Sequence, residues 1–280
     1  MLAVGLALVS ALAYGTSDYI GGVLSKTRSS WTVALVAQLV SALVTAALAL
    51  VFAGSPTGAD FGWAAAGGVG EAVGIAALYR GLARGRMGIV APISGIGATL
   101  VPVVVGVATG DQPSVTAWIG IALAFPAVYL IPRAPGSASD GSTSDGVVTG
   151  TVAGLGFGAQ FAFVGQIGDG SGFLPLALLW LVSAATIAVV ATLLRQPWIP
   201  RRDGRLGPVL AFGPISAVAV ASFLLATREG LFTVVSVIAA LYPAVTVAMA
   251  AAVLRERIGR LQAVGLLLAA ATVVLVTVGR

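Results

Sequence analysis

The sequence has no cysteine and no histidine among its 280 residues, and only 9% of its residues are charged. Without these two residue types the chain offers no thiol nucleophile, no disulfide and none of the usual zinc or haem ligands. Soluble domains carry about 25% charged residues, so this chain has too few to cover a water-exposed surface. These absences exclude a soluble metalloenzyme or thiol enzyme and leave lipid as the natural solvent.

Apolar residues dominate instead, at 58% of the chain with a mean hydropathy of +1.04. A bilayer-spanning helix needs about 20 apolar residues, so ten helices would take about 200 positions and leave about 80 for connections. Open strands are excluded because unpaired backbone groups are costly in hydrocarbon. We predict an all-α integral membrane protein with ten transmembrane helices, at Leu2–Val23, Thr32–Phe52, Phe61–Tyr79, Met87–Thr109, Val115–Ile131, Val147–Ile167, Phe173–Leu194, Leu206–Ala226, Leu231–Leu254 and Ile258–Val278.

The basic residues are concentrated in alternate connections. The net charge of +5 and the pI near 10.2 would suggest nucleic acid in a soluble protein, but here their placement indicates topology, and we predict no nucleic-acid partner. Cytoplasmic loops carry the excess of Lys and Arg. The odd-numbered loops are therefore predicted to be cytoplasmic and both termini extracytoplasmic, in the plasma membrane. The odd-numbered loops contain Lys26, Arg28, Arg80, Arg84, Arg86, Arg133, Arg195, Arg201, Arg202, Arg205, Arg255, Arg257 and Arg260, and the other face has only Arg228 and Arg280.

A stretch rich in Pro, Gly, Ser and Asp divides the chain nearly in half. We predict a first five-helix repeat over residues 1–133, a flexible linker over 134–146 and a second five-helix repeat over 147–280. A shift of 145 residues superposes the halves without a gap and places Asp111 on Glu256. Because five is odd, the second copy must be inverted relative to the first, and the charge bias of the loops reverses accordingly. Inverted repeats are an architecture of secondary transporters.

Residues 230–262 read GLFTVVSVIAALYPAVTVAMAAAVLRERIGRLQ. This stretch resembles the second-half signature of the EamA-like branch of the drug/metabolite transporter superfamily. The matching features are a small-residue turn, an apolar span with a central Pro, an acidic residue beside Arg, and a last helix that opens with Gln and Gly. A weaker copy runs from Gly85 to Gly120, and LAYGTSDYIGG at Leu12–Gly22 is similar to the first span of such proteins.

The resemblance implies a ten-helix carrier that moves small metabolites, amino acids or drugs by alternating access. The smaller four-span multidrug relatives have a glutamate in the middle of the first helix. Here that region holds Ser10, Ala13 and Tyr14, so this coupling device does not transfer. Many relatives are also described with cytoplasmic termini, opposite to the prediction from the Arg count.

Two carboxylates are candidates for substrate binding or coupling. Glu71 is near the centre of the third span, where an ionised carboxylate costs a few kcal/mol and must be paired, hydrated or protonated. Arg80 is nine residues away, about 13.5 Å along a helix, which is too far for direct pairing. Glu71 would suit proton coupling or a cationic substrate; the alternative is a packing role. Asp18 is one turn beyond Tyr14, and its alternative role is an interfacial pair with Lys26 or Arg28.

Polar and aromatic residues within the spans complete the candidate site. Gln38 and Gln160 can contact ligand or form interhelical hydrogen bonds. Tyr14, Tyr79, Trp180 and Tyr242 are candidates for an aromatic wall around a cation or a planar solute. The other tryptophans, near span ends, are better explained as interfacial anchors.

Proline and glycine mark breaks and close contacts. Pro92, Pro102 and Pro243 lie inside predicted spans, where they remove backbone hydrogen bonds and are candidates for helix breaks or gating. Two small-residue stripes, Gly150, Gly154, Gly158 and Ala66, Gly70, Gly74, are expected to be packing seams.

The leading prediction is a secondary active transporter, an exporter with protons as the candidate coupling ion, rather than an enzyme. The chain has no Walker-type phosphate loop, and we predict no cofactor and no metal. The partners are a small-molecule substrate and the lipid bilayer. A passive channel or facilitator remains an alternative, and an intramembrane lipid-modifying enzyme is a distant third because it would need several convergent catalytic groups.

Overall fold

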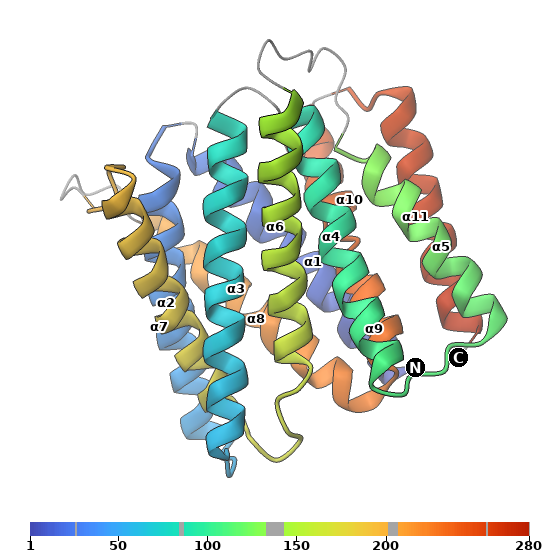
Figure 1. Cartoon of the computed structure of the whole chain (residues 1–280), viewed down its shortest axis with the longest axis horizontal. Helices are drawn as coiled ribbons and strands as arrows, with labels where there is room; N and C mark the ends of the chain where they lie inside the picture. The colour runs from blue at the N-terminus through green and yellow to red at the C-terminus, as the bar shows by residue number, and fades with distance from the viewer. Residues whose placement is uncertain (26, 84–86, 133–142, 201–206, 256, 280) are drawn as a thin grey trace.

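The computed structural model describes residues 1–25, 27–83, 87–132, 143–200, 207–255 and 257–279, and its elements are all helices (Figure 1). The prediction of an all-helical chain is confirmed for these residues. Helix α6 begins inside the range predicted as linker, and most of that linker lies outside the described residues. The helices are α1 (Leu2–Ser25), α2 (Ser30–Val51), α3 (Gly58–Ala83), α4 (Met87–Ala108), α5 (Val115–Leu130), α6 (Thr143–Val164), α7 (Leu174–Leu193), α8 (Gly207–Glu229), α9 (Phe232–Ala239), α10 (Tyr242–Val253) and α11 (Arg260–Val278).

The ninth predicted span consists of two short helices, α9 and α10. At the break, the Ala240 N–H donates to the Ser236 carbonyl at 2.9 Å and closes the last turn of α9. Pro243 is near the start of α10, where its missing N–H costs nothing. Pro92 and Pro102 lie inside α4, which runs without interruption. A proline therefore accompanies a helix break in span nine and not in span four.

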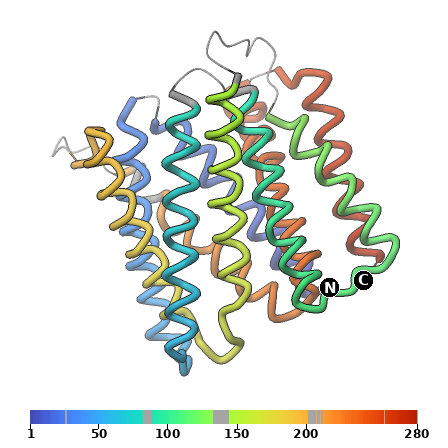
Figure 2. The backbone as a smooth tube through the Cα atoms, in the orientation of Figure 1, coloured from blue at the N-terminus to red at the C-terminus, as the bar shows by residue number. Residues whose placement is uncertain are grey.

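Eight segments of the described chain, with α9 and α10 taken together as one, are long and apolar enough to cross a bilayer, and α5 is a shorter apolar helix. The chain is thus a multi-pass membrane protein. Both termini lie at one end of the bundle (Figures 1 and 2). We call this end the terminal end. Helices α1, α3, α5 and α7 finish at the opposite end, and α6 starts there (Figure 1).

The most extensively packed pairs of helices follow a regular scheme. Spans five places apart, such as α1 and α6, make equivalent contacts. The contact of α3 with α6 is matched by that of α8 with α1, and the contact of α3 with α7 is matched by that of α8 with α2. Helix α4 packs against α6 as α1 packs against α9 and α10. The pairs α2 with α7, α4 with α9, and α5 with α11 join corresponding spans directly. If every span is replaced by the one five places along the chain, so that α1 becomes α6 and α3 becomes α8, these pairs map onto one another.

Close backbone contacts allow α6 to fit between α3 and α4. A Cβ atom added to Gly156 would lie 2.6 Å from the Gly70 carbonyl oxygen, and one added to Gly154 would lie 2.8 Å from the Ser94 carbonyl oxygen. Both small-residue stripes predicted from the sequence lie on these contacts, so the expected packing seams are confirmed.

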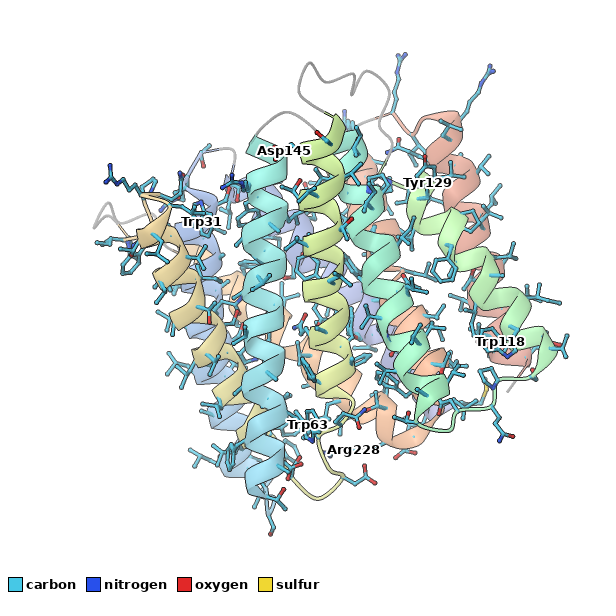
Figure 3. All side chains as sticks on the ribbon, viewed as in Figure 1. Trp31, Trp63, Trp118, Tyr129, Asp145 and Arg228 are labelled. Carbon is cyan, nitrogen blue, oxygen red and sulfur yellow. The ribbon has the colours of Figure 1, made fainter. Side chains whose placement is uncertain are left out.

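At the terminal end, Asp60 and Arg228 join three segments of the chain. Its carboxylate accepts hydrogen bonds from the backbone N–H groups of Gly168 and Thr57, each at 2.7 Å. Arg228 on α8 donates to the Gly168 carbonyl and the Ser171 hydroxyl, each at 3.0 Å. Figure 3 labels Arg228 and Trp63 at this end. The start of α3, the α6–α7 connection and the end of α8 are therefore tied together.

Asp111 ties the α4–α5 connection to the start of α9. Its Oδ2 atom accepts from the backbone N–H of Thr233 at 2.6 Å and from the Thr233 hydroxyl at 2.7 Å. Thr233 is in the first turn of α9, where backbone N–H groups have no partner inside the helix. A carboxylate from the other half of the chain thus caps this helix, and the helix dipole favours its charge.

The two halves of span nine differ in burial. Seven of the eight residues of α9 are buried, from Thr233 to Ala239, whereas no residue of α10 is buried. Helix α9 belongs to the terminal end and α10 to the opposite end (Figure 1). The molecule is therefore tightly packed around span nine at the terminal end and loosely packed at the other.

Candidate functional site

Glu71 lies on α3 with a side chain that is only 7% exposed. Its Oε1 atom accepts a hydrogen bond at 3.1 Å from Nε2 of Gln38, a buried residue of α2. Its Oε2 atom has no hydrogen-bond partner, and neither has Oε1 of Gln38. Ser183 on α7 is close to the same carboxyl group, and its hydroxyl also has no hydrogen-bond partner. Three helices therefore bring polar groups to one buried point and leave part of their bonding capacity unused.

A second polar pair lies beside this point. The hydroxyl of Tyr14 on α1 interacts with the side chain of Gln160, a buried residue of α6 whose Nε2 atom has no partner. Tyr14 is also close enough to Glu71 for an electrostatic interaction. The two glutamines predicted from the sequence thus both belong to the polar interior.

Asp18 lies on the inner face of α1 and is nevertheless exposed. Ala7, Ala11 and Tyr14 precede it by eleven, seven and four residues, spacings that place all four on one side of a helix. Ala7 and Ala11 are buried, and Tyr14 packs against the core, so this side faces the protein. Asp18 also interacts electrostatically with Glu71. The exposure of Asp18 therefore indicates accessible surface inside the bundle, next to the half of α1 that lies away from the terminal end.

Aromatic rings from three helices surround Tyr14. Its ring centroid is 5.9 Å from that of Tyr242 on α10 and 5.5 Å from that of Phe161 on α6, and Phe161 in turn lies 4.8 Å from Phe223 on α8. Tyr242 is the first residue after the break in span nine. Thr246, one turn later, donates to the Gly15 carbonyl at 3.1 Å and fixes α10 against α1. The rings form an aromatic layer next to the polar groups.

Two predicted aromatic residues are less directly involved. Tyr79 interacts electrostatically with Asp18 and Glu71, but its ring packs edge-on against Trp31 at 6.2 Å. Trp31 on α2, expected to be an interfacial anchor, is only 7% exposed, because residues of α3 and α7 pack around it in a small cluster. Trp180 is fully buried in the main apolar core, and its indole N–H has no partner.

Some members of the site could not be found by reading spans one at a time. Ser183 and Phe161 are ordinary residues of apolar runs, and only the packing of α7 and α6 brings them to Glu71 and Tyr14. Their signal in the sequence was weak, because serine and phenylalanine are common in membrane helices.

The arrangement has the chemistry of a binding site for a small solute. No described basic side chain contacts Glu71, and the ion pair formed by Arg228 with Asp169 lies at the terminal end. The described residues contain no group of three acidic side chains able to hold a metal ion. What converges is two carboxylates, two amides and a hydroxyl beside aromatic rings.

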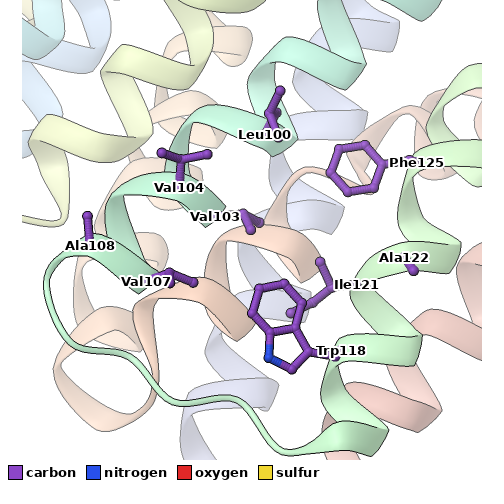
Figure 4. A pocket seen from close by; sticks show the side chains of 9 residues that line it. All are labelled: Leu100, Val103, Val104, Val107, Ala108, Trp118, Ile121, Ala122 and Phe125. Atoms are coloured by element: carbon purple, nitrogen blue, oxygen red, sulfur yellow. The ribbon is translucent and has the colours of Figure 1, made fainter.

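A surface groove lies elsewhere. It has a volume of about 600 Å³ and lies between α4 and α5, where Trp118 and Phe125 face Val103 and Val104 (Figure 4). Its lining is entirely apolar, and Val104 and Trp118 are exposed. This groove has the character of a lipid-facing surface rather than of the polar interior.

Comparison with known proteins gives a family match for the second half of the chain. Residues 145–278 match the EamA-like transporter family. The second half of this chain is EamA-like. The resemblance drawn from residues 230–262 is thereby confirmed. No curated protein matches the chain.

A solved structure described as "Crystal structure of protein" supports the fold of the chain. It has a TM-score of 0.75 at 11% sequence identity, and the match covers 99% of this chain and 96% of that one. At this identity the likeness extends to the fold alone. It covers both halves, whereas the family match covers only the second.

Proposed function

We propose that this protein is a secondary active transporter that moves a small molecule across the plasma membrane by alternating access. The observation that carries the proposal is Glu71, which is buried in a membrane span with an unpaired oxygen beside Gln38. A charged side chain deep in a span costs a few kcal/mol and is a functional candidate by default. In a chain with an EamA-like half, the corresponding function is binding of the transported solute or of a coupling ion.

The packing scheme supports two inverted five-helix repeats. Exchange of each span with the one five places away leaves the set of the most extensively packed pairs unchanged, as expected of two halves related by a twofold axis. Because each half has five spans, that axis would lie in the membrane plane. Inverted repeats that meet at a central site are the architecture that alternating access uses.

The burial of span nine supports a state open toward the end opposite the termini. There Asp18 is exposed on the inner face of α1, and no residue of α10 is buried. At the terminal end α9 is buried, Asp111 caps it and Asp60 joins the neighbouring connections. Transport would require these contacts to open while the α10 end closes.

The arginine distribution assigns the open end to the cytoplasm. Arg28, Arg80, Arg195, Arg255 and Arg257 all follow or finish helices whose C-terminal ends lie away from the termini (Figure 1). The positive-inside rule then places both termini outside. An empty carrier that rests open to the cytoplasm is suited to collecting a solute for export, with protons as the candidate counter-ion.

The test is transport by purified protein in liposomes, with Glu71→Gln compared with the wild type. The substitution preserves shape and removes the charge, so uptake should fall at least ~10-fold and its response to a pH gradient should be lost. Glu229→Gln is the matched control, because it makes the same change at an exposed position at the end of α8. Unchanged transport and pH response in Glu71→Gln would exclude Glu71 from the mechanism.

A passive channel and an intramembrane enzyme are the alternatives. A channel has no need of two inverted copies around a broken helix, and an enzyme needs several convergent catalytic groups. Counterflow distinguishes the channel, because only a carrier exchanges labelled for unlabelled solute against a gradient.

A further inference from the structure

The buried polar point has an excess of hydrogen-bond acceptors. Gln38 and Glu71 are both more than 90% buried, and Oε1 of Gln38 and Oε2 of Glu71 have no partner. A carbonyl oxygen and a carboxylate oxygen only accept hydrogen bonds, whereas the Ser183 hydroxyl nearby can either donate or accept. Buried polar atoms left unpaired cost about 1–3 kcal/mol each. A solute that presents N–H donors would satisfy these acceptors.

The charges of the interior have one sign. Glu71 and Asp18 interact electrostatically with each other, and no described basic side chain contacts Glu71. Two like charges in a poorly solvated interior disfavour an anionic ligand and favour a cation. Asp18 is exposed and Glu71 is buried, so a cation that enters from the α10 end meets Asp18 first.

The aromatic layer lies next to these carboxylates. Tyr14 and Tyr242 are 5.9 Å apart between ring centroids, and both interact electrostatically with Asp18. Each keeps some accessible surface, in contrast to the buried core of the bundle. Tyrosine faces attract ammonium groups and pack well against apolar or aromatic bodies.

We infer that this interior binds an organic ammonium ion with an apolar or aromatic body. The ammonium group donates to Glu71 and Gln38, and the body lies against Tyr14 and Tyr242. Asp18 attracts the cation at the entrance. The inference rests on the proposed function only in taking this interior as the solute site, and it adds the chemical class of the solute.

The experiment compares amines with alcohols of the same shape. Butylamine, tyramine and tryptamine are matched with butanol, tyrosol and tryptophol, and binding to the purified full-length protein is measured by equilibrium dialysis. At least one amine should bind at least ~10-fold more tightly than its alcohol. Glu71→Gln should weaken that amine ~30-fold or more, because truncation of one partner of a buried charge pair has a large effect, mainly on dissociation. Glu71→Asp should retain part of the affinity, and Glu229→Gln should leave it unchanged.

Asp18→Asn separates the entrance from the buried site. Loss of an exposed charge should slow association of the amine several-fold with little change in dissociation, and the effect should diminish in high salt. Thermal unfolding of each variant, followed by circular dichroism, checks that it is folded.

The inference is overturned if no amine binds, if the alcohols bind as tightly as the amines, or if folded Glu71→Gln protein binds amines like the wild type. Failure of the transport proposal has a different signature. Amines would then bind through Glu71 but show no counterflow in liposomes. Counterflow of uncharged solutes that is insensitive to Glu71→Gln would support a carrier and contradict the ammonium site.

Discussion

Gly156→Ala should separate α3 from α6 and destabilise the protein. A Cβ atom at this position would lie 2.6 Å from both the Gly70 carbonyl oxygen and the Gly74 backbone nitrogen, whereas ordinary contacts begin at 3.4 Å. Both obstructing atoms are backbone atoms of α3, which cannot rotate away as a side chain could, so α3 must move by roughly 0.8 Å, the difference between 3.4 and 2.6 Å. Overpacking of this kind costs about 1–3 kcal/mol. Alanine recovers about 0.5–1 kcal/mol of this in a helix, because it has the higher helix propensity.

The matched control is Gly62→Ala on α3, because a Cβ atom there would have no neighbour within 4 Å. Both variants make the same chemical change in a helix, so the difference between their free energies of unfolding isolates the interhelical contact. We expect Gly62→Ala to be at least as stable as the wild type. Gly156→Ala should be less stable than Gly62→Ala by about 1–3 kcal/mol. Denaturant unfolding in detergent, followed by circular dichroism, measures this difference. Equal stability of the two variants would refute the close packing of α6 on α3.

Two further predictions concern the ends of the bundle. Asp111→Ala should lower the free energy of unfolding by about 1–2 kcal/mol, because the start of α9 loses its cap. Asp169→Ala, at an exposed carboxylate, should change the free energy of unfolding by less than about 0.5 kcal/mol. Equal effects of the two substitutions would contradict the cap. Since the chain has no native cysteine, single-cysteine variants can map access. Gly22→Cys, one turn beyond Asp18, should react with a membrane-impermeant maleimide applied to the side opposite the termini. Ser236→Cys, on buried α9, should not react. The reverse pattern would contradict the proposed open end.

The helices could be predicted from the sequence because each span needs its own apolar run, and the small-residue stripes identified the seams around α6. The split of span nine could not be placed, since a proline alone does not decide it: α4 continues through Pro92 and Pro102, and α5 and α8 contain prolines that drew no prediction. Glu71 stood out by its depth.

Long-range partners were beyond prediction. The hydrogen bond from Gln38 to Glu71 depends on how α2 and α3 are rotated against each other, and the cap of α9 by Asp111 joins residues 122 positions apart. Ser183 reaches the carboxyl group only because α7 packs on α3. Composition and periodicity define which face of a helix is apolar, but not which neighbour that face meets.

Counterflow in proteoliposomes tests the central claim most directly. Vesicles loaded with a high concentration of unlabelled solute are diluted into a trace of labelled solute, with tyramine as the first choice. The account predicts transient accumulation of label above its external concentration, abolished by Glu71→Gln and preserved by Glu229→Gln. Simple equilibration of label without any overshoot, at the same rate in wild-type and Glu71→Gln vesicles, would contradict a carrier built around this carboxylate.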